Sequence, residues 1–342
     1  MTGFFARGRS LGSSICLSFF VFAGMLLAAE GSYRLYVHVA KPLYRPSSVP
    51  HLIWELTPGA DHGVKFRVNE LGFRDHVRGA WSPWNDLDFK IAVLGDSVTV
   101  GPGMHDSETY SRLIEQDLKR QGMAARVLNM GLDATNSRQH LALLEGRALQ
   151  FSPDVILLGY FMNDTEISPW ETLPAFIQEL MRHFHFGVFL CQRVMQSLRN
   201  HRNRAWGREK AAGPSAVSAC SGYVREILDT YQAGDWPRTA DSIRRMALIS
   251  AESKTHFGIV LFPFEDQVLG ICPADAQFRI RAFLADAGIP MLDLLPVFKK
   301  AAGTKLYLPG DPIHLNQAGH RLAAQGISAW LLSEKWVKKS EG

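Results

Sequence analysis

Apolar residues fall along this chain in one long N-terminal run and in a series of short runs that begin at residue 89. Most of the short runs are apolar throughout, which is typical of strands that are buried on both faces. Alternating strands and helices predict an α/β fold, with a parallel five-stranded sheet that helices cover on both faces. The expected strands are Phe89–Gly95, Arg126–Gly131, Asp154–Gly159, His256–Phe262 and Ile289–Leu292, and the expected helices are Ser107–Gln121, Ser137–Gln150, Asp275–Ala287 and Asn316–Trp336.

The long run, Leu11–Ala29, carries no charged residue and is close to the length of about 20 residues that a membrane-spanning helix needs. Arg7 and Arg9 precede it, so the positive-inside rule predicts a cytoplasmic N-terminus and an exported remainder. The alternatives are a cleaved signal peptide and a buried core helix. The sequence matches a signal-peptide cleavage site poorly, because Leu26 or Leu27 stands where such a site has a small residue.

The region between the anchor and the first strand is hard to classify from its pattern. Prolines at positions 42, 46, 50 and 58 interrupt regular structure, whereas Asn69–Asp75 has the composition of an ordered turn. We therefore divide the chain into an anchor at 1–30, a juxtamembrane segment at 31–87 and one domain at 88–336.

The composition of the chain excludes several classes of protein. The chain has 342 residues, of which 46% are hydrophobic and 20% charged, so it is neither disordered, collagen-like, coiled-coil nor multi-span. A net charge of +4 is too small to indicate a nucleic-acid-binding protein. The exported part holds Cys191, Cys220 and Cys272, which allow one disulfide plus a free thiol or three buried thiols; their spacing matches no zinc site. We expect no metal and no cofactor.

Candidate chemistry lies in the turns after the expected strands, because ligands of parallel sheets bind beyond the carboxyl ends of the strands. Gly95-Asp96-Ser97 follows the first strand, Gly131 ends the second, and Asn163 follows the third; Asp311 and His314 stand just before the last helix. Each alone is consistent with a turn or a cap. Together they supply a nucleophile (Ser97), a base (His314), its orienting carboxylate (Asp311) and oxyanion donors (Ser97, Gly131 and Asn163). We interpret the neighbouring Asp96, Asp164, Asn316 and His320 as turn, capping or helix residues.

The same residues carry a family resemblance. Ser97 in Gly-Asp-Ser, Gly131, Asn163, and His314 in Asp-x-x-His resemble the four signature blocks of the SGNH, or GDSL-type, hydrolase superfamily, over roughly residues 88–335. The resemblance implies a flavodoxin-like three-layer α/β/α fold and metal-independent serine esterase, lipase or acyl-transfer chemistry. Val98 replaces the Leu of the GDSL name, and Phe161 stands where a Gly is often found two residues before the Asn, which would alter the acyl pocket.

The N-terminal run and Asn69–Asp75 also resemble a bacterial, membrane-anchored subgroup of these proteins. This implies a single-pass protein of the bacterial inner membrane with a periplasmic catalytic domain. We expect an ester hydrolase for O-acyl groups of envelope glycan or lipid. The alternatives are an O-acyltransferase that modifies an envelope polysaccharide with the same residues, and a non-catalytic binding or assembly factor.

A helical insertion is expected at about 165–255, where the connection between two strands is far longer than usual. One interpretation is a small subdomain with its own core and a solvated basic loop. The other is that the aromatic part borders the acyl pocket while the basic part contacts anionic lipid or glycan. The aromatic residues are Trp170, Phe176, Phe184, Phe186 and Phe189, and the basic residues are Arg199, Arg202, Arg204, Arg208 and Lys210.

Overall fold

The computed structural model describes residues 11–61, 66–74, 89–168, 171–191, 193–194, 197, 220, 222–231, 235–301 and 303–337. Its strands are β1 (Tyr44–Pro46), β2 (Trp54–Leu56), β3 (Phe89–Gly95), β4 (Ala125–Gly131), β5 (Val155–Phe161), β6 (His256–Phe262) and β7 (Met291–Asp293). Its α-helices are α1 (Leu11–Ala40), α2 (Ser97–Val100), α3 (Tyr110–Arg120), α4 (Ser137–Gly146), α5 (Ala175–His183), α7 (Gly222–Thr230), α8 (Trp236–Glu252), α9 (Glu265–Val268), α10 (Asp275–Asp286), α11 (Leu295–Lys300) and α12 (Gln317–Ser333). Short 3-10 helices lie at Asp106–Glu108, Ala148–Phe151 and Met162–Thr165.

The central sheet has five parallel strands in the order β4-β3-β5-β6-β7. The predicted α/β fold with a parallel five-stranded sheet is therefore confirmed, and each expected strand lies within two residues of its observed bounds. The chain direction across the sheet reverses between β3 and β5, which is the topological switch point where open α/β sheets bind their ligands.

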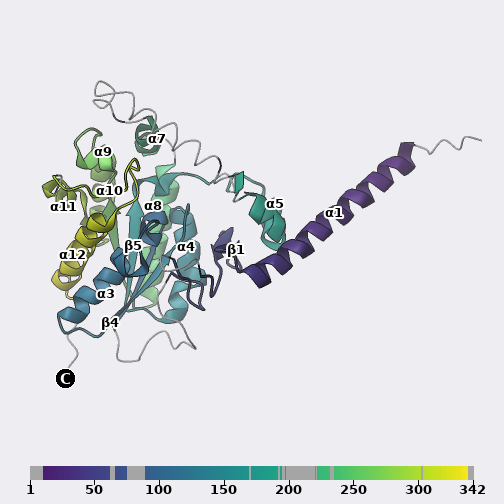
Figure 1. The fold of residues 1–342 in the computed structure, drawn as a ribbon. Coiled ribbons are helices and arrows are strands. Elements are labelled where there is room, and N and C mark those ends of the chain that lie inside the picture. The colour runs from purple at the N-terminus through teal and green to yellow at the C-terminus, as the bar shows by residue number, and fades with distance from the viewer. Residues whose placement is uncertain are drawn as a thin grey trace, which may run out of the picture.

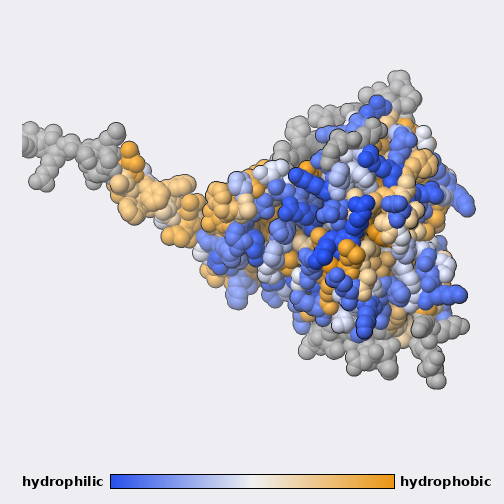
Figure 2. All heavy atoms as spheres, turned by 180° about the vertical axis from the view of Figure 1, so that it is seen from behind, coloured by the Kyte–Doolittle hydropathy of each residue, from blue (hydrophilic) through white to orange (hydrophobic). Residues whose placement is uncertain are grey.

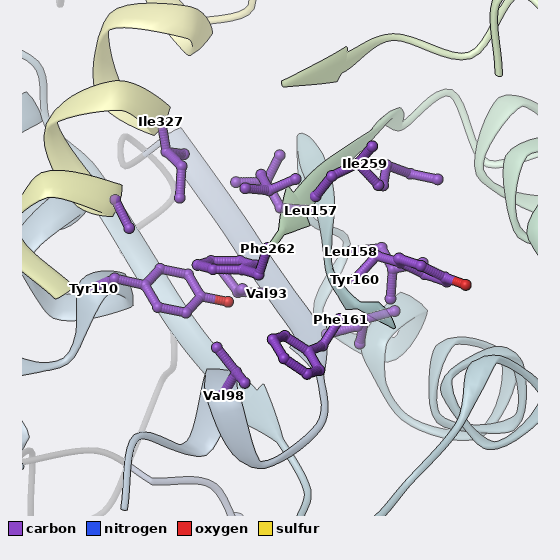
Figure 3. Packing of buried hydrophobic residues seen from close by; sticks show 14 of the residues in the cluster. Val93, Val98, Tyr110, Leu157, Leu158, Tyr160, Phe161, Ile259, Phe262 and Ile327 are labelled. Atoms are coloured by element: carbon purple, nitrogen blue, oxygen red, sulfur yellow. The ribbon is translucent and has the colours of Figure 1, made fainter. Parts of the chain in front are cut away.

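Helices cover both faces of this sheet (Figure 1). On one face α3 packs against α12 and β4, and on the other α4 packs against α8. The strands β3, β4, β5 and β6 are mostly buried between these layers, β5 at every position, whereas the edge strand β7 is half-buried. Figure 3 shows aromatic rings and branched aliphatic side chains of the strands meeting those of the α3 and α12 layer, among them Tyr110 of α3, Phe262 of β6 and Ile327 of α12.

The N-terminal helix α1 extends away from this body (Figure 1). Its part Ser14–Ala40 is long and apolar enough to cross a membrane, by length and composition. The juxtamembrane segment is more ordered than its prolines suggested, because β1 and β2 form an antiparallel hairpin. The predicted turn near Asn69 is present: the Asn69 side-chain oxygen accepts the backbone N–H groups of Leu71 and Phe73, both at 3.0 Å.

The predicted insertion is shorter than 165–255. The helix α8 contacts α4 and β6 and so belongs to the regular helix layer. Trp170 and the basic residues from Arg199 to Lys210 lie outside the described residues. Phe186 and Phe189 pack against Tyr33 of α1, so the prediction that the aromatic part borders the acyl pocket is not supported for these two rings.

The cysteines follow one of the two predicted alternatives. Cys220 and Cys272 form a disulfide, with their Cα atoms 4.7 Å apart. Cys191 is a free thiol, as is Cys16 in α1. The disulfide ties the described residue before α7 to the loop between α9 and α10.

Candidate active site

Three glycines lie at one level of the sheet: Gly95, which ends β3, is the register partner of Gly131, which ends β4, and of Gly159, two residues before the end of β5. They leave room for α2 to lie directly on the strand ends. A Cβ at Gly131 would lie 2.5 Å from the backbone nitrogen of Val100, and one at Gly159 would lie 2.6 Å from the Thr99 hydroxyl. This packing places Ser97, the first residue of α2, at the switch point.

The structure brings the three predicted catalytic residues together. The Ser97 hydroxyl lies 2.8 Å from Nε2 of His314, in a position to donate to it. On the other side of the ring, Nδ1 of His314 donates to Oδ2 of Asp311 at 2.6 Å. The second carboxylate oxygen of Asp311 accepts the backbone N–H groups of Ile313 and His314, which fixes the loop before α12. This arrangement can remove the proton of the Ser97 hydroxyl.

Charge around the ring favours the protonated imidazole. Burial alone would lower the pKa of His314, but the hydrogen bond and charge of Asp311, with the charges of Asp96 and Asp133, raise it above the usual 6.5. Burial would raise the pKa of Asp311, yet its hydrogen bonds with His314 hold it below 3.8. The carboxylate thus remains ionised and can stabilise an imidazolium that forms during a reaction.

The predicted oxyanion donors differ in how they are used. The Asn163 side chain makes no hydrogen bond with any described residue, and its oxygen is buried without a partner. Its amide is therefore available to a ligand. The Gly131 N–H, in contrast, donates to the side-chain oxygen of Asn129 at 2.9 Å. Gly131 is needed for the close approach of α2, and its predicted role as an oxyanion donor is not supported because that N–H is already bonded.

The four neighbouring polar residues have the expected structural contacts. Asp96 caps α2 by accepting the N–H of Val98, and Asn316 caps α12 by accepting the N–H of Gly319. Asp164 accepts the N–H of Phe161. His320 accepts the N–H of Tyr110 through Nδ1 at 3.2 Å, and burial lowers the pKa of His320 to about 3, which keeps the ring neutral.

Comparison with known families identifies the fold and its chemistry. Residues 93–322 match the profile of the family described as GDSL-like Lipase/Acylhydrolase. The chain belongs to this family. Membership makes the protein a serine ester hydrolase of the SGNH superfamily. A comparison with curated protein sequences gave no match.

Solved structures similar to the hydrolase include TesA (14% identity, TM-score 0.44, covering 70% of this chain and 97% of TesA). The lipase/acylhydrolase from Enterococcus faecalis has 16% identity and a TM-score of 0.43, and the match covers 74% of this chain and all of the other (100%). An acetyl xylan esterase, AlAXEase, has 13% identity and a TM-score of 0.43, with 70% and 98% coverage.

Arg74 supports the hydrolase site and was not singled out from the sequence. Its guanidinium, 1% exposed, pairs with Asp106 at 2.9 Å and donates to the carbonyls of Val100, Gly101 and Met104 at 2.5–2.6 Å. It thereby holds the loop that follows α2. The predicted ordered turn at Asn69–Asp75 was the available signal, because this turn delivers Arg74 to the loop.

Asp133 is a second residue that the sequence did not reveal. It lies in the loop after β4, and its charge raises the pKa of His314. The Tyr44 hydroxyl donates to its carboxylate, and the Trp54 indole N–H donates to its carbonyl oxygen. The β1–β2 hairpin of the juxtamembrane segment therefore fixes one wall of the site. Among the described residues, no cluster of three or more His, Cys, Asp or Glu side chains could hold a metal ion.

Proposed function

We propose that the hydrolase uses Ser97, His314 and Asp311 as a catalytic triad to cleave acyl esters. The observation that carries this proposal is the hydrogen-bonded line from the Ser97 hydroxyl through His314 to Asp311. The two distances, 2.8 and 2.6 Å, lie within the reach expected of a nucleophile, its base and the group that orients the base.

In the proposed mechanism, His314 takes the proton of Ser97 as the oxygen attacks the ester carbonyl. The imidazolium is stabilised by the Asp311 carboxylate. The side-chain amide of Asn163 and the backbone N–H of Ser97 donate to the oxyanion of the tetrahedral intermediate. His314 then protonates the leaving alcohol, and water releases the acyl group from Ser97 by the same steps in reverse order.

We further propose that the catalytic domain lies in the periplasm, anchored to the bacterial inner membrane by α1. The length and apolar character of Ser14–Ala40 and the preceding Arg7 and Arg9 support this orientation. The Cys220–Cys272 disulfide supports an oxidising compartment. The proposed substrates are O-acyl groups of envelope glycan or lipid, which are within reach of an enzyme held at the membrane.

The test uses the full-length protein in detergent with an O-acetylated glycan and with esters of increasing chain length. We expect free carboxylate as the product whether or not an acceptor glycan is present, and a loss of about 10⁴-fold or more in turnover for Ser97→Ala. If the acyl group is recovered on the acceptor glycan, the enzyme is an acyltransferase and the proposal of hydrolysis is wrong. Undiminished turnover of the Ser97→Ala protein would overturn the triad.

A further inference from the structure

Outside α1, exposed large hydrophobic side chains are concentrated on one segment of the described chain. They are Phe176 and Leu180 of α5, which are 71% and 62% exposed, followed by Leu190 and Val194 at 47% and 58%. The remaining examples are spread singly: Leu248 lies on α8, Leu269 in the loop after α9 and Phe278 on α10. Exposed apolar side chains gathered beside one another indicate a surface that something covers.

This segment is fixed to α1 at the point where the helix leaves its uncharged stretch. Glu30 is the first charged residue after that stretch. Its carboxylate accepts the backbone N–H groups of His185 and Phe186 at 3.1 and 2.8 Å. Arg34, one turn further along, pairs with Glu30 at 2.6 Å and donates to the carbonyl of His183 at 2.8 Å. The backbone at 183–186 therefore lies level with the end of the uncharged stretch.

Aromatic rings surround the same level. Tyr33 packs against Phe189 and Phe186, with ring centroids 5.1 and 6.3 Å apart. Glu30 and Tyr33 are about 4.5 Å apart along the helix axis, at 1.5 Å per residue. Rings at this depth correspond to the aromatic belt that membrane proteins place at the boundary between acyl chains and headgroups.

The helix α5 has one attached face and one uncovered face. On the attached face, Arg182 donates to the carbonyl of Ser48 at 3.1 Å, which ties α5 to the juxtamembrane segment. Phe176 and Leu180, four residues apart, share the other face, where both side chains are exposed. Figure 1 places α5 beside the C-terminal end of α1, and Figure 2 shows the apolar surface of α1 reaching the point where that helix meets the body.

We propose that Ala175–Cys191 is a membrane-interface segment, which rests on the leaflet at the catalytic-domain side of the membrane and inserts Phe176, Leu180 and Leu190 among the lipid acyl chains. The occupant of this surface is lipid because the surface continues the apolar surface of α1 at the depth where α1 enters the membrane. The segment holds the catalytic domain at one fixed orientation over the leaflet. This inference rests on the proposed membrane anchor.

The test measures lipid contact in the full-length protein reconstituted in phosphatidylcholine/phosphatidylglycerol vesicles. Cys16 and Cys191 are replaced by Ser, the Cys220–Cys272 disulfide is kept, and one cysteine is introduced for a fluorophore. Leu180→Cys and Phe176→Cys report on the interface segment. Phe278→Cys is the matched control, since Phe278 is 61% exposed and lies on α10. Phe20→Cys reports on insertion of α1. Lipids brominated on their acyl chains quench only fluorophores that contact those chains.

We expect quenching at positions 20, 176 and 180 and none at position 278. Quenching at position 20 with no more at 176 and 180 than at 278 would overturn the interface segment and leave the anchor intact. Absence of quenching at position 20 would overturn both. Protection of positions 176 and 180 from aqueous iodide without bromine quenching would indicate that a second copy of the chain covers this face, which also contradicts the proposal.

Discussion

Arg74 offers a demanding test of how the site is supported, because its side chain is buried against four partners behind α2. Replacing it by Met keeps most of its length and removes its charge. Asp106, whose side chain is 8% exposed, would then be an ionised carboxylate without its ion-pair partner. Removing one member of a buried ion pair costs about 3–5 kcal/mol. The carbonyls of Val100 and Gly101 would lose their guanidinium donor as well.

This cost corresponds to a fall in melting temperature of about 6–20 °C, since about 1 kcal/mol shifts a domain of this size by about 2–4 °C. We would measure it on the full-length protein in detergent by thermal unfolding. Arg120→Met is the control, because Arg120 pairs with Asp117 on the surface, is 73% exposed, and such pairs contribute about 0–1 kcal/mol. The double variant Arg74→Met/Asp106→Asn should recover part of the loss. A melting temperature for Arg74→Met equal to that of Arg120→Met would refute the reasoning.

Three further predictions concern the site and its surroundings. Asp311→Asn should lower turnover by about 10⁴-fold and move the acidic limb of the pH–rate profile to lower pH, because His314 acts as a base only when neutral and Asp311 raises its pKa; an unmoved limb would contradict this. Gly131→Ala should lower turnover and melting temperature, since its Cβ would meet the Val100 nitrogen at 2.5 Å, whereas Gly303→Ala, with open space around it, should change neither. Cys272→Ser should destabilise the fold by about 4 kcal/mol from loss of a cross-link across 52 residues, and equal denaturation midpoints for wild type and variant would exclude a stabilising disulfide.

The fold was predictable because its strands are short, apolar and separated by helices with clear spacing. The positions of Ser97 and Asn163 followed from the same pattern, because parallel strands bring their carboxyl ends to one edge. His314 was found instead by its place in Asp-x-x-His just before the last helix. What local sequence predicts well here is the placement of a residue at the end of an element.

The partner of each hydrogen-bonding group could not be predicted from the local sequence pattern. The N–H of Gly131 donates to the side chain of Asn129, two residues earlier in the chain. A glycine is required at this position because the backbone of α2 packs against it. Only the packed structure reveals these two contacts. Arg74 and Asp133 act through partners that are distant in sequence, such as Asp106 and Tyr44. Such contacts depend on tertiary packing, and no periodicity in the chain encodes them.

The extent of the insertion was misjudged for a related reason. A stretch of about ninety residues between two strands suggested a separate unit, but α8 within it packs on β6 as an ordinary crossover helix. The contact between Tyr33 and Phe189 joins the N-terminal helix to this stretch across more than 150 residues of sequence. Neither feature has a signal in the local pattern.

Covalent labelling with a fluorophosphonate tests the central claim most directly. The reagent phosphonylates a serine whose hydroxyl is activated by a neighbouring base, so mass spectrometry of the labelled peptide identifies that serine. We predict a single adduct on Ser97 in the wild-type protein, and none in Ser97→Ala or at a pH where His314 is protonated. An adduct on another serine, or labelling that persists in Ser97→Ala, would contradict the assignment of Ser97 as the nucleophile.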